Sequence, residues 1–316
     1  MNTIIFGTVA FDAIETPYAK TDKIIGGSGT YSCFSASYFV RPQTLSAVGY
    51  DFPQEFIQKL KDKGIDLDGM QIKKDEKSMF WSCRYFDNMN QRETLTTELN
   101  VVANYKPILP DSYKDTEYIM LGNGDPVLQR TVLEQLNHKP KFVALDTMNF
   151  WMDTMMDELK KTISMVDIII INDEEACQLS GGERRLSKAA HIICDMGPRY
   201  VIIKKGEHGA MLFSKDKVFS APALPLEDVV DPTGAGDTFA GAFIGYIAQQ
   251  DKTDFETLKT AVIVASAMAS FTVKFKVFFS PGSSVPTSLS TSNHAGSSFS
   301  VQYSVFVPTL FISNEK

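Results

Sequence analysis

Short apolar runs alternate with longer amphipathic segments through the middle of the chain. The runs are residues 142–145, 168–171 and 201–203. Between the first two, in segment 153–166, apolar residues recur every three or four positions, which is the spacing of one helix face. They are Met156, Leu159, Ile163 and Val166. This alternation predicts an α/β fold with a mainly parallel sheet, in which the strands flanking that helix lie parallel.

The isoleucine run 168–171 predicts a buried strand, because no apolar run approaches the length needed to span a membrane. The first seven residues lack the basic region and the long apolar stretch of a signal peptide. We therefore expect a cytoplasmic protein with no membrane partner.

Residues 78–86 and 92–99 flank a polar turn at 87–91, and this pattern predicts a β-hairpin. The hairpin could stand over an active site as a lid, or it could form a plain sheet edge. The local pattern fits both interpretations equally well.

The character of the chain changes after Val273, where Ser, Gly and Pro become frequent and no helical period remains. We expect a main domain over residues 1–273 and a divergent, poorly ordered Ser-rich tail over 274–316. Residues 299–312 are apolar enough to pack as a strand, so disorder of the whole tail is left open.

Charge and cysteine spacing argue against nucleic-acid binding and against a zinc or thioredoxin-type site. The formal net charge is −7 and no Lys/Arg cluster stands out, which argues against nucleic-acid binding. The cysteines form no C-x-x-C pair, which disfavours a zinc site or a thioredoxin-type motif. They are Cys33, Cys83, Cys177 and Cys194.

A Gly-rich turn over residues 231–237 precedes an apolar run with helical spacing. Glycines at a helix N-terminus leave backbone N–H groups for an anion, and Asp237 beside them could accept a proton from an attacking hydroxyl. This combination suits phosphoryl transfer. The alternative is a plain helix start in which Asp237 only complements the helix dipole. No Walker A loop is present.

The turn resembles the signature D-T-x-G-A-G-D of the ribokinase-like, or PfkB, family of carbohydrate and nucleoside kinases. Pro232 stands here in place of the Thr. The resemblance implies that Asp237 is the catalytic base, that Gly234, Ala235 and Gly236 form the anion hole, and that Thr233 lies near the nucleotide.

Two further segments match the family in the same order. Asn172 and Glu175 are similar to its N-x-x-E motif, which implies a role with Mg²⁺ and phosphate, although Asn172 could simply cap a helix. Residues 201–210 resemble the strand and G-x-x-G turn beside the nucleotide. In this segment Lys204 would face ATP phosphates, while Gly206 and Gly209 permit the turn. An ordinary hairpin with a solvated lysine explains that segment equally well.

Near the N-terminus the chain resembles the family's Gly-Gly signature, where the acceptor molecule binds. The matching residues are Gly26, Gly27, Ser28 and Tyr31, together with Asp12, which is similar to the acidic residue that holds substrate hydroxyls. A solvated loop position for Asp12 is the alternative. Many members carry Asn where this chain has Tyr31, and a phenol is bulkier than an amide and favours stacking.

The resemblance implies a three-layer α/β/α sandwich with a small β lid around residues 12–25 and 78–99. It implies a monomer, or a homodimer formed through the lid, that moves the γ-phosphate of ATP to a hydroxyl of a small sugar or nucleoside. Mg²⁺ would be required, and a monovalent cation near Asp231 is left open.

Two other functions compete with the kinase interpretation. The resemblance ends near residue 273, so a catalytically impaired member acting as a ligand-binding or regulatory protein is the alternative. A nucleotide-cofactor oxidoreductase is disfavoured, because residues 4–10 lack the pattern G-x-G-x-x-G.

Overall fold

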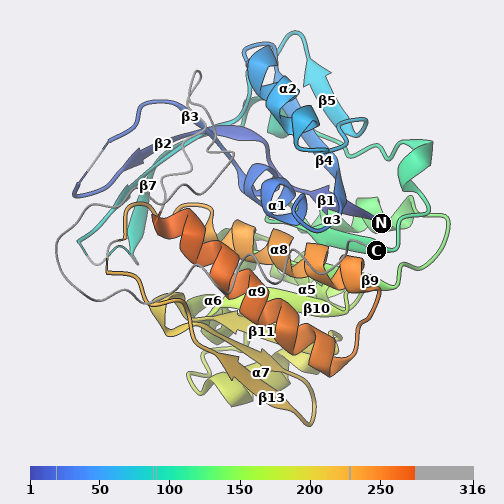
Figure 1. Ribbon diagram of the computed structural model, residues 1–316, viewed down its shortest axis with the longest axis vertical. Helices are drawn as coiled ribbons and strands as arrows, with labels where there is room; N and C mark the ends of the chain where they lie inside the picture. Colours follow the sequence, from blue (N-terminus) through green and yellow to red (C-terminus); the bar gives the residue numbers. More distant parts are fainter. Residues whose placement is uncertain (19, 88, 90, 228, 275–316) are drawn as a thin grey trace, which may run out of the picture. The chain divides into compact units, whose positions relative to one another are not determined.

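A mainly parallel sheet forms the centre of the fold (Figure 1). The computed structural model describes residues 1–274 except 19, 88, 90 and 228. Within them the sheet has nine strands in the order β13-β12-β11-β10-β9-β8-β1-β4-β5. Their bounds are β1 Asn2–Phe6, β4 Arg41–Gly49, β5 Met70–Lys73, β8 Tyr118–Leu121, β9 Phe142–Leu145, β10 Ile168–Asn172, β11 Tyr200–Lys204, β12 Ala210–Phe213 and β13 Val218–Ala221. Only the pairs β11–β12 and β12–β13 are antiparallel, so the predicted sheet is confirmed.

Helices cover both faces of this sheet, as a three-layer sandwich requires (Figure 1). The α-helices are α1 Ser28–Ala36, α2 Gln54–Asp62, α3 Pro126–Glu134, α4 Asn149–Thr154, α5 Met156–Ile163, α6 Asp173–Leu179, α7 Leu186–Cys194, α8 Ala235–Gln250 and α9 Phe255–Lys274. The 3₁₀ turns are η1 Asn100–Val102, η2 Asp111–Tyr113 and η3 Gly206–His208. The tail prediction lies outside the described residues except for Lys274, which ends α9.

The isoleucine run lies in β10, where its four side chains are fully buried. Successive side chains of a strand point to opposite faces, so a strand covered on both sides can be apolar throughout. Ile169 and Ile171 join a hydrophobic cluster with Leu159 and Ile163 of α5. The predicted helix and the parallel pairing of β9 with β10 are both confirmed.

Helices α1 and α8 run side by side with their N-termini at the same end. A Cβ on Gly241 would collide with the Ser32 carbonyl and the Ser35 hydroxyl, and one on Gly245 would lie 3.0 Å from Ala36 Cα. The small residues of α8 therefore let the two backbones approach closely. This contact brings the Gly-Gly segment that precedes α1 near the Gly-rich turn that precedes α8.

Helix α9 corrects one expectation. By length and composition it is apolar enough to cross a membrane, whereas the sequence pattern predicts no segment of that length. Its residues Leu258, Ala261 and Val262 are fully buried in the fold, and 39% of the apolar stretch is buried. Part of the apolar surface of α9 is therefore buried against the domain.

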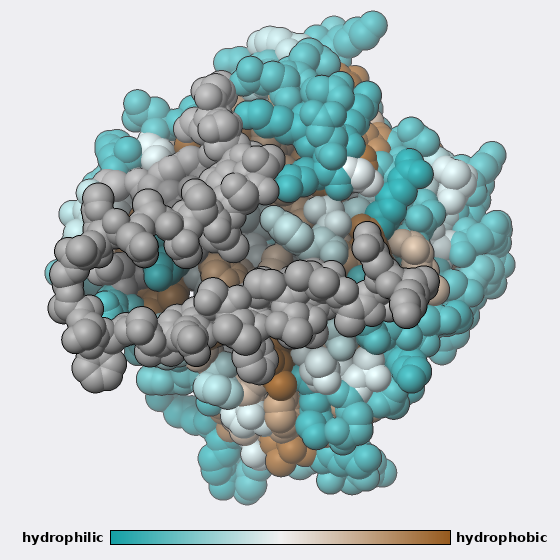
Figure 2. Space-filling model, in the orientation of Figure 1, coloured by the Kyte–Doolittle hydropathy of each residue, from teal (hydrophilic) through white to brown (hydrophobic). Residues whose placement is uncertain are grey.

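Figure 2 shows a largely hydrophilic face with apolar patches towards the β11–β13 end of the sheet.

A smaller sheet unites the two segments predicted to form a lid. Within the described residues its order is β3-β2-β6-β7, with bounds β2 Ala10–Glu15, β3 Ile24–Gly26, β6 Phe80–Tyr85 and β7 Arg92–Glu98. The predicted hairpin is β6–β7, and the parallel pairing of β2 with β6 joins it to the N-terminal segment. Ile14, Ile24, Cys83, Tyr85 and Met89 form its own small core.

Candidate active site

Three side chains meet where neighbouring parallel strands end. Asp146 directly follows β9, Asn172 ends β10 and Lys204 ends β11. Asn172 and Lys204 are register partners. Because parallel strands end at one edge of their sheet, this edge gathers groups from distant parts of the chain, and such edges commonly bind ligands.

Asn172 and Glu175 form a capping box at the start of α6. Asn172 Oδ1 accepts from the Glu175 N–H and Glu175 Oε2 accepts from the Asn172 N–H, both at 2.8 Å. The capping interpretation is therefore confirmed. The other Glu175 oxygen is not part of the cap. Burial raises the pKa of Glu175 to about 7, against the lowering effect of Lys204.

The Gly-rich turn begins α8 with a glycine as its N-cap. Gly234 adopts a left-handed conformation with φ 75°, and it carries no side chain to cap the helix. The Ala235 N–H donates to the Pro232 carbonyl at 3.1 Å, so this amide is already bonded within the turn. Asp237 lies in the first turn, and its carbonyl accepts from Ser32 Oγ at 2.9 Å.

The carboxyl group of Asp237 is surrounded by charges of both signs. Its pKa is raised to about 6, first by desolvation and then by the negative charge of Asp146. Lys204 and Arg92 act in the opposite direction. A carboxyl group in this range takes up and releases protons near neutral pH, as a general base requires.

Lys204 is not a solvated strand-end lysine. Its side chain is 19% exposed, and Nζ lies 3.8 Å from Asp146 Oδ1. A Cβ on Gly236 would lie 3.1 Å from Nζ, so the ammonium group sits over the first turn of α8. Burial would lower the pKa of Lys204, but Asp146, Glu175 and Asp237 together raise it, and the lysine stays charged.

The turn after Lys204 requires glycine. Gly206 has φ 53° and Gly209 has φ 84°, and a Cβ on Gly209 would collide with the Ala221 carbonyl. The segment is a β11–β12 hairpin, as the plain structural interpretation predicts. Its part in nucleotide binding stays a prediction.

Asp12 lies in strand β2 and is only 3% exposed, so the solvated-loop alternative is wrong. Gly27 N–H donates to its Oδ2 at 3.4 Å, and a Cβ on Gly26 would collide with the same oxygen. Burial raises the pKa of Asp12 to about 7; the Gly27 bond lowers it, while Asp237 and Asp231 raise it. The structure thus joins Asp12 to the Gly-Gly segment.

Tyr31 packs its ring onto the Gly-rich turn. A Cβ on Gly234 would lie 2.5 Å from three atoms of this ring, so the ring faces that glycine. Burial, followed by the charges of Asp12, Asp231 and Asp237, raises the pKa of Tyr31 and keeps the phenol neutral. Ser28 has a structural bond instead, because its Oγ accepts from the Thr8 N–H at 3.2 Å.

Three residues of this region, Tyr85, Arg92 and Asp146, were not predicted from the sequence. The Tyr85 hydroxyl accepts from Thr233 Oγ1 at 3.1 Å and from Arg92 Nη1 at 3.2 Å. Thr233 is also held by its own N–H, which donates to Asp231 Oδ1 at 2.9 Å. The small sheet therefore touches the Gly-rich turn directly. Asp146 follows a predicted strand just as Asn172 does. Its position at the end of a parallel strand could therefore have identified it as a candidate site residue.

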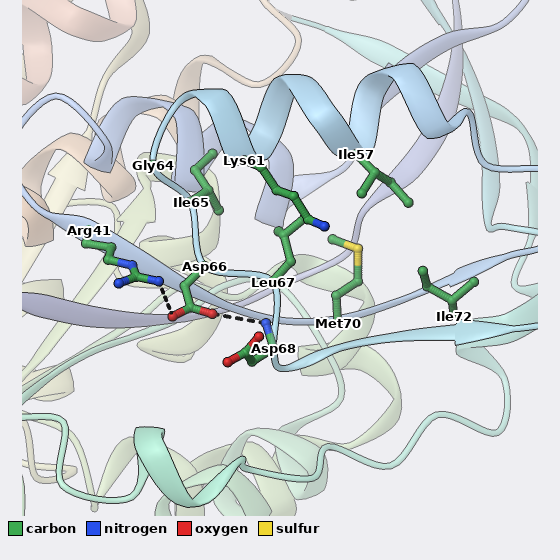
Figure 3. Close-up of a pocket in the computed structure, with 10 residues that line it drawn as sticks. All are labelled: Arg41, Ile57, Lys61, Gly64, Ile65, Asp66, Leu67, Asp68, Met70 and Ile72. Carbon is green, nitrogen blue, oxygen red and sulfur yellow. Dashed lines mark hydrogen bonds and ion pairs between the residues drawn. The ribbon is translucent and has the colours of Figure 1, made fainter.

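A cavity of about 590 Å³ lies elsewhere, between α2 and the edge strand β5 (Figure 3). Arg41 and Asp66 point toward each other there and form an ion pair at 2.9 Å. The strands β4, β1 and β8 separate β5 from β9, and none of the site residues above lines this cavity. It therefore carries no part of the candidate chemistry.

The site offers few direct metal ligands. Among the described residues, no group of three or more His, Cys, Asp or Glu side chains is placed to hold a metal ion. Mg²⁺ usually keeps several waters and needs only one or two protein carboxylates beside substrate phosphates. Glu175 and the Asn172 amide fit such a hydrated ion.

Comparisons with known proteins agree on one family. A family model described as pfkB family carbohydrate kinase matches residues 4–276. A cytidine kinase of Thermococcus kodakarensis is 29% identical over 255 residues, covering 78% of this chain and 88% of the relative.

Solved structures show the same fold. A nucleoside kinase of Methanocaldococcus jannaschii matches with a TM-score of 0.70 and 21% identity, over 87% of this chain and 93% of that one. A ribokinase II-type structure from E. coli, which contains ATP and Mg²⁺, matches with a TM-score of 0.72 and 19% identity, over 86% and 92% of the two chains. The likeness confirms the ribokinase-like three-layer fold.

Proposed function

The chain belongs to the pfkB family of carbohydrate kinases, and we propose that Asp237 is the general base with which it phosphorylates a small nucleoside or sugar. As a member of this family it is an ATP-dependent phosphotransferase that acts on a hydroxyl acceptor. The observation that carries the proposal is the position of Asp237 in the first turn of α8, with a pKa of about 6 and Lys204 over the same turn.

In the proposed reaction Asp237 takes the proton of the acceptor hydroxyl as that oxygen forms its bond to the γ-phosphorus. The bond from this phosphorus to the bridging oxygen breaks, and ADP leaves with the electron pair. Gly234, Ala235 and Gly236 would let the phosphoryl group approach the helix N-terminus, and Lys204 would lie against its negative charge. Gly206, Gly209 and Thr233 would border the nucleotide.

Asn172 and Glu175 would hold Mg²⁺ through its waters, and when bound the ion supplies positive charge to the phosphates. The capping box fixes both side chains at the end of β10, which supports this role. A monovalent cation near Asp231 stays a prediction.

The acceptor would bind beside Asp12, Gly26, Gly27, Ser28 and Tyr31. Buried Asp12 offers carboxylate oxygens to sugar hydroxyls, and the ring of Tyr31 closes the space beside Gly234. We favour a nucleoside, because the relatives reported above are a cytidine kinase and a nucleoside kinase. The small sheet would act as the lid, and a monomer, or a homodimer through this lid, stays a prediction, as does a cytoplasmic location.

The direct test is the substitution Asp237→Asn, assayed by ADP release with a panel of nucleosides and sugars. Loss of general-base help should lower kcat by about 10²- to 10⁴-fold while calorimetry shows ATP affinity largely kept. Asp251→Asn is the matched control, since Asp251 follows the other end of α8. Unchanged turnover in Asp237→Asn would show that the assigned base is wrong.

The alternative of a ligand-binding or regulatory member rests on the family match ending at residue 276 of 316. That alternative predicts no ADP release with any acceptor, together with a rise in melting temperature on adding one nucleoside or sugar of the panel.

A further inference from the structure

Asp146 is a buried carboxylate that the proposed reaction does not use. It is 6% exposed, and its neighbours hold it firmly. Its N–H donates to the Leu121 carbonyl at 2.8 Å, its carbonyl accepts from Gln129 Nε2 at 3.1 Å, and its Oδ1 accepts from the Thr147 N–H at 3.0 Å. A buried carboxylate is costly without a charged partner.

The partner is Lys204, whose Nζ lies 3.8 Å from Asp146 Oδ1. A lysine side chain is flexible, and its ammonium group pairs with whichever carboxylate is best placed. Three carboxylates act on it, those of Asp146, Glu175 and Asp237. Within the described residues its ion pair is with Asp146 and not with Asp237.

We propose that Asp146 is the positioning residue for Lys204, holding its ammonium group over the first turn of α8 and away from the carboxylate of Asp237. This inference rests on the proposed function, in which Lys204 faces the transferring phosphoryl group and Asp237 must stay free to accept a proton. The fixed backbone of Asp146 makes it a rigid anchor, whereas Asp237 is needed for the chemistry.

The electrostatic surroundings of Asp237 agree with this division of roles. The charge of Asp146 raises the pKa of Asp237, and Lys204 and Arg92 lower it. The charge of Asp12 also interacts with Asp237, and Tyr31 and Asp231 lie in the same group of interacting residues. Removing the charge of Asp146 therefore lowers the pKa of Asp237 for two reasons. A negative neighbour is lost, and Lys204 is released towards Asp237.

The substitution Asp146→Asn isolates this effect, because an amide oxygen can still accept the Thr147 N–H. We expect kcat to fall by about 10²-fold, as misplacement of a catalytic group by about 1 Å can cause. The acid limb of the pH profile of kcat/KM, which reports the free enzyme, should move to lower pH. ADP should also bind more weakly by calorimetry without acceptor, a readout that does not depend on turnover.

A double-mutant cycle with Lys204→Met decides whether Asp146 acts through Lys204. If it does, the variant with both substitutions is no slower than Lys204→Met alone, since the lysine to be positioned is already gone. Asp251→Asn is the matched control, because Asp251 pairs with Lys141 at 2.9 Å outside the site. This control should keep wild-type kcat, ADP affinity and pH profile.

Additive losses in the cycle, or an acid limb that does not move in Asp146→Asn, would overturn the proposal. If Asp146→Asn does not fold, as judged by its melting curve, Asp146→Ser takes its place in the cycle, because its hydroxyl can accept the same backbone bond. Failure here is separable from failure of the proposed function. Failure of the proposed function appears as unchanged turnover in Asp237→Asn. Failure of the Asp146 proposal appears as unchanged or additive behaviour of the Asp146 variants while Asp237→Asn shows its expected loss of turnover.

Discussion

Glycines at this site leave room for functional side chains as well as turning the backbone. A Cβ on Gly26 would collide with the Asp12 carboxylate, one on Gly236 would crowd the Lys204 ammonium group, and one on Gly234 would meet the Tyr31 ring. Each glycine therefore fixes the place of one chemical group. A glycine in such a motif can thus be required by a side chain that lies close in space but outside the motif in the sequence.

The pH dependence of turnover tests the assigned base at the residue scale. The pKa of Asp237 is raised to about 6, mainly by burial, so the carboxylate that accepts the proton is lost as pH falls through about 6. We expect kcat/KM, which reports pKa values of the free enzyme, to be full above about pH 7 and to fall tenfold per pH unit well below 6. A profile of kcat/KM measured from pH 5 to 8 checks this. A kcat/KM that stays flat down to pH 5 would contradict it.

At the scale of elements, a hydrogen bond of Tyr85 joins the small sheet to the turn that precedes helix α8. Tyr85, near the turn of the β6–β7 hairpin, accepts hydrogen bonds from Thr233 before α8 and from Arg92 on β7. Arg92 also lies over the Trp81 ring at 5.2 Å. The lid strands are thereby tied to the turn that carries the catalytic Asp of the proposed mechanism.

Removing this tie should weaken acceptor binding. In Tyr85→Phe the hydroxyl and both of its hydrogen bonds are lost while the ring remains. The bond from Thr233, which joins the small sheet to the turn, is worth about 0.5–1.5 kcal/mol. We expect KM for the acceptor to rise about 3- to 10-fold with ATP affinity unchanged. Tyr118→Phe is the matched control, because its hydroxyl bonds Asp251 at the far end of α8. Equal kinetic effects in both variants would refute the proposed role of the tie.

At the scale of the whole molecule, buried carboxyl groups make stability depend on pH. The pKa values of Asp12 and Glu175 are raised to about 7 in the folded chain, from ordinary values of 3.8 and 4.5. Between the ordinary pKa of each group and its raised pKa of about 7, the folded state binds more protons than the unfolded state. The free energy of unfolding therefore falls as pH rises through this range. This is the cost of keeping carboxyl groups buried for binding.

We therefore expect the melting temperature, measured without ligand, to fall between about pH 5 and pH 7.5. Asp12→Asn removes one of these groups, so it should raise the melting temperature at pH 7.5 and flatten the pH dependence. Glu183→Gln is the control, because Arg185 lowers the pKa of Glu183 to about 2 and the group does not titrate in this range. A wild-type melting temperature that rises from pH 5 to 7.5 would contradict the expectation.

The sequence by itself determined several central elements and the family resemblance. Four successive isoleucines predict a strand buried on both faces, and the spacing from Met156 to Ile163 predicts its covering helix, because these signals depend only on local periodicity. The ordered glycine motifs and Asp237 identified the kinase resemblance for the same reason, since each motif is contiguous in the chain.

Tertiary structure alone decided which groups face one another. Tyr85 and Thr233 are separated by 148 positions, and Asp146 and Lys204 meet only because β9, β10 and β11 lie side by side. The burial of Asp12 is also a result of tertiary packing, because the local sequence fits a solvated loop position as well. Contacts between elements follow from strand order, register and helix packing, and those depend on the burial of the whole chain rather than on any one segment.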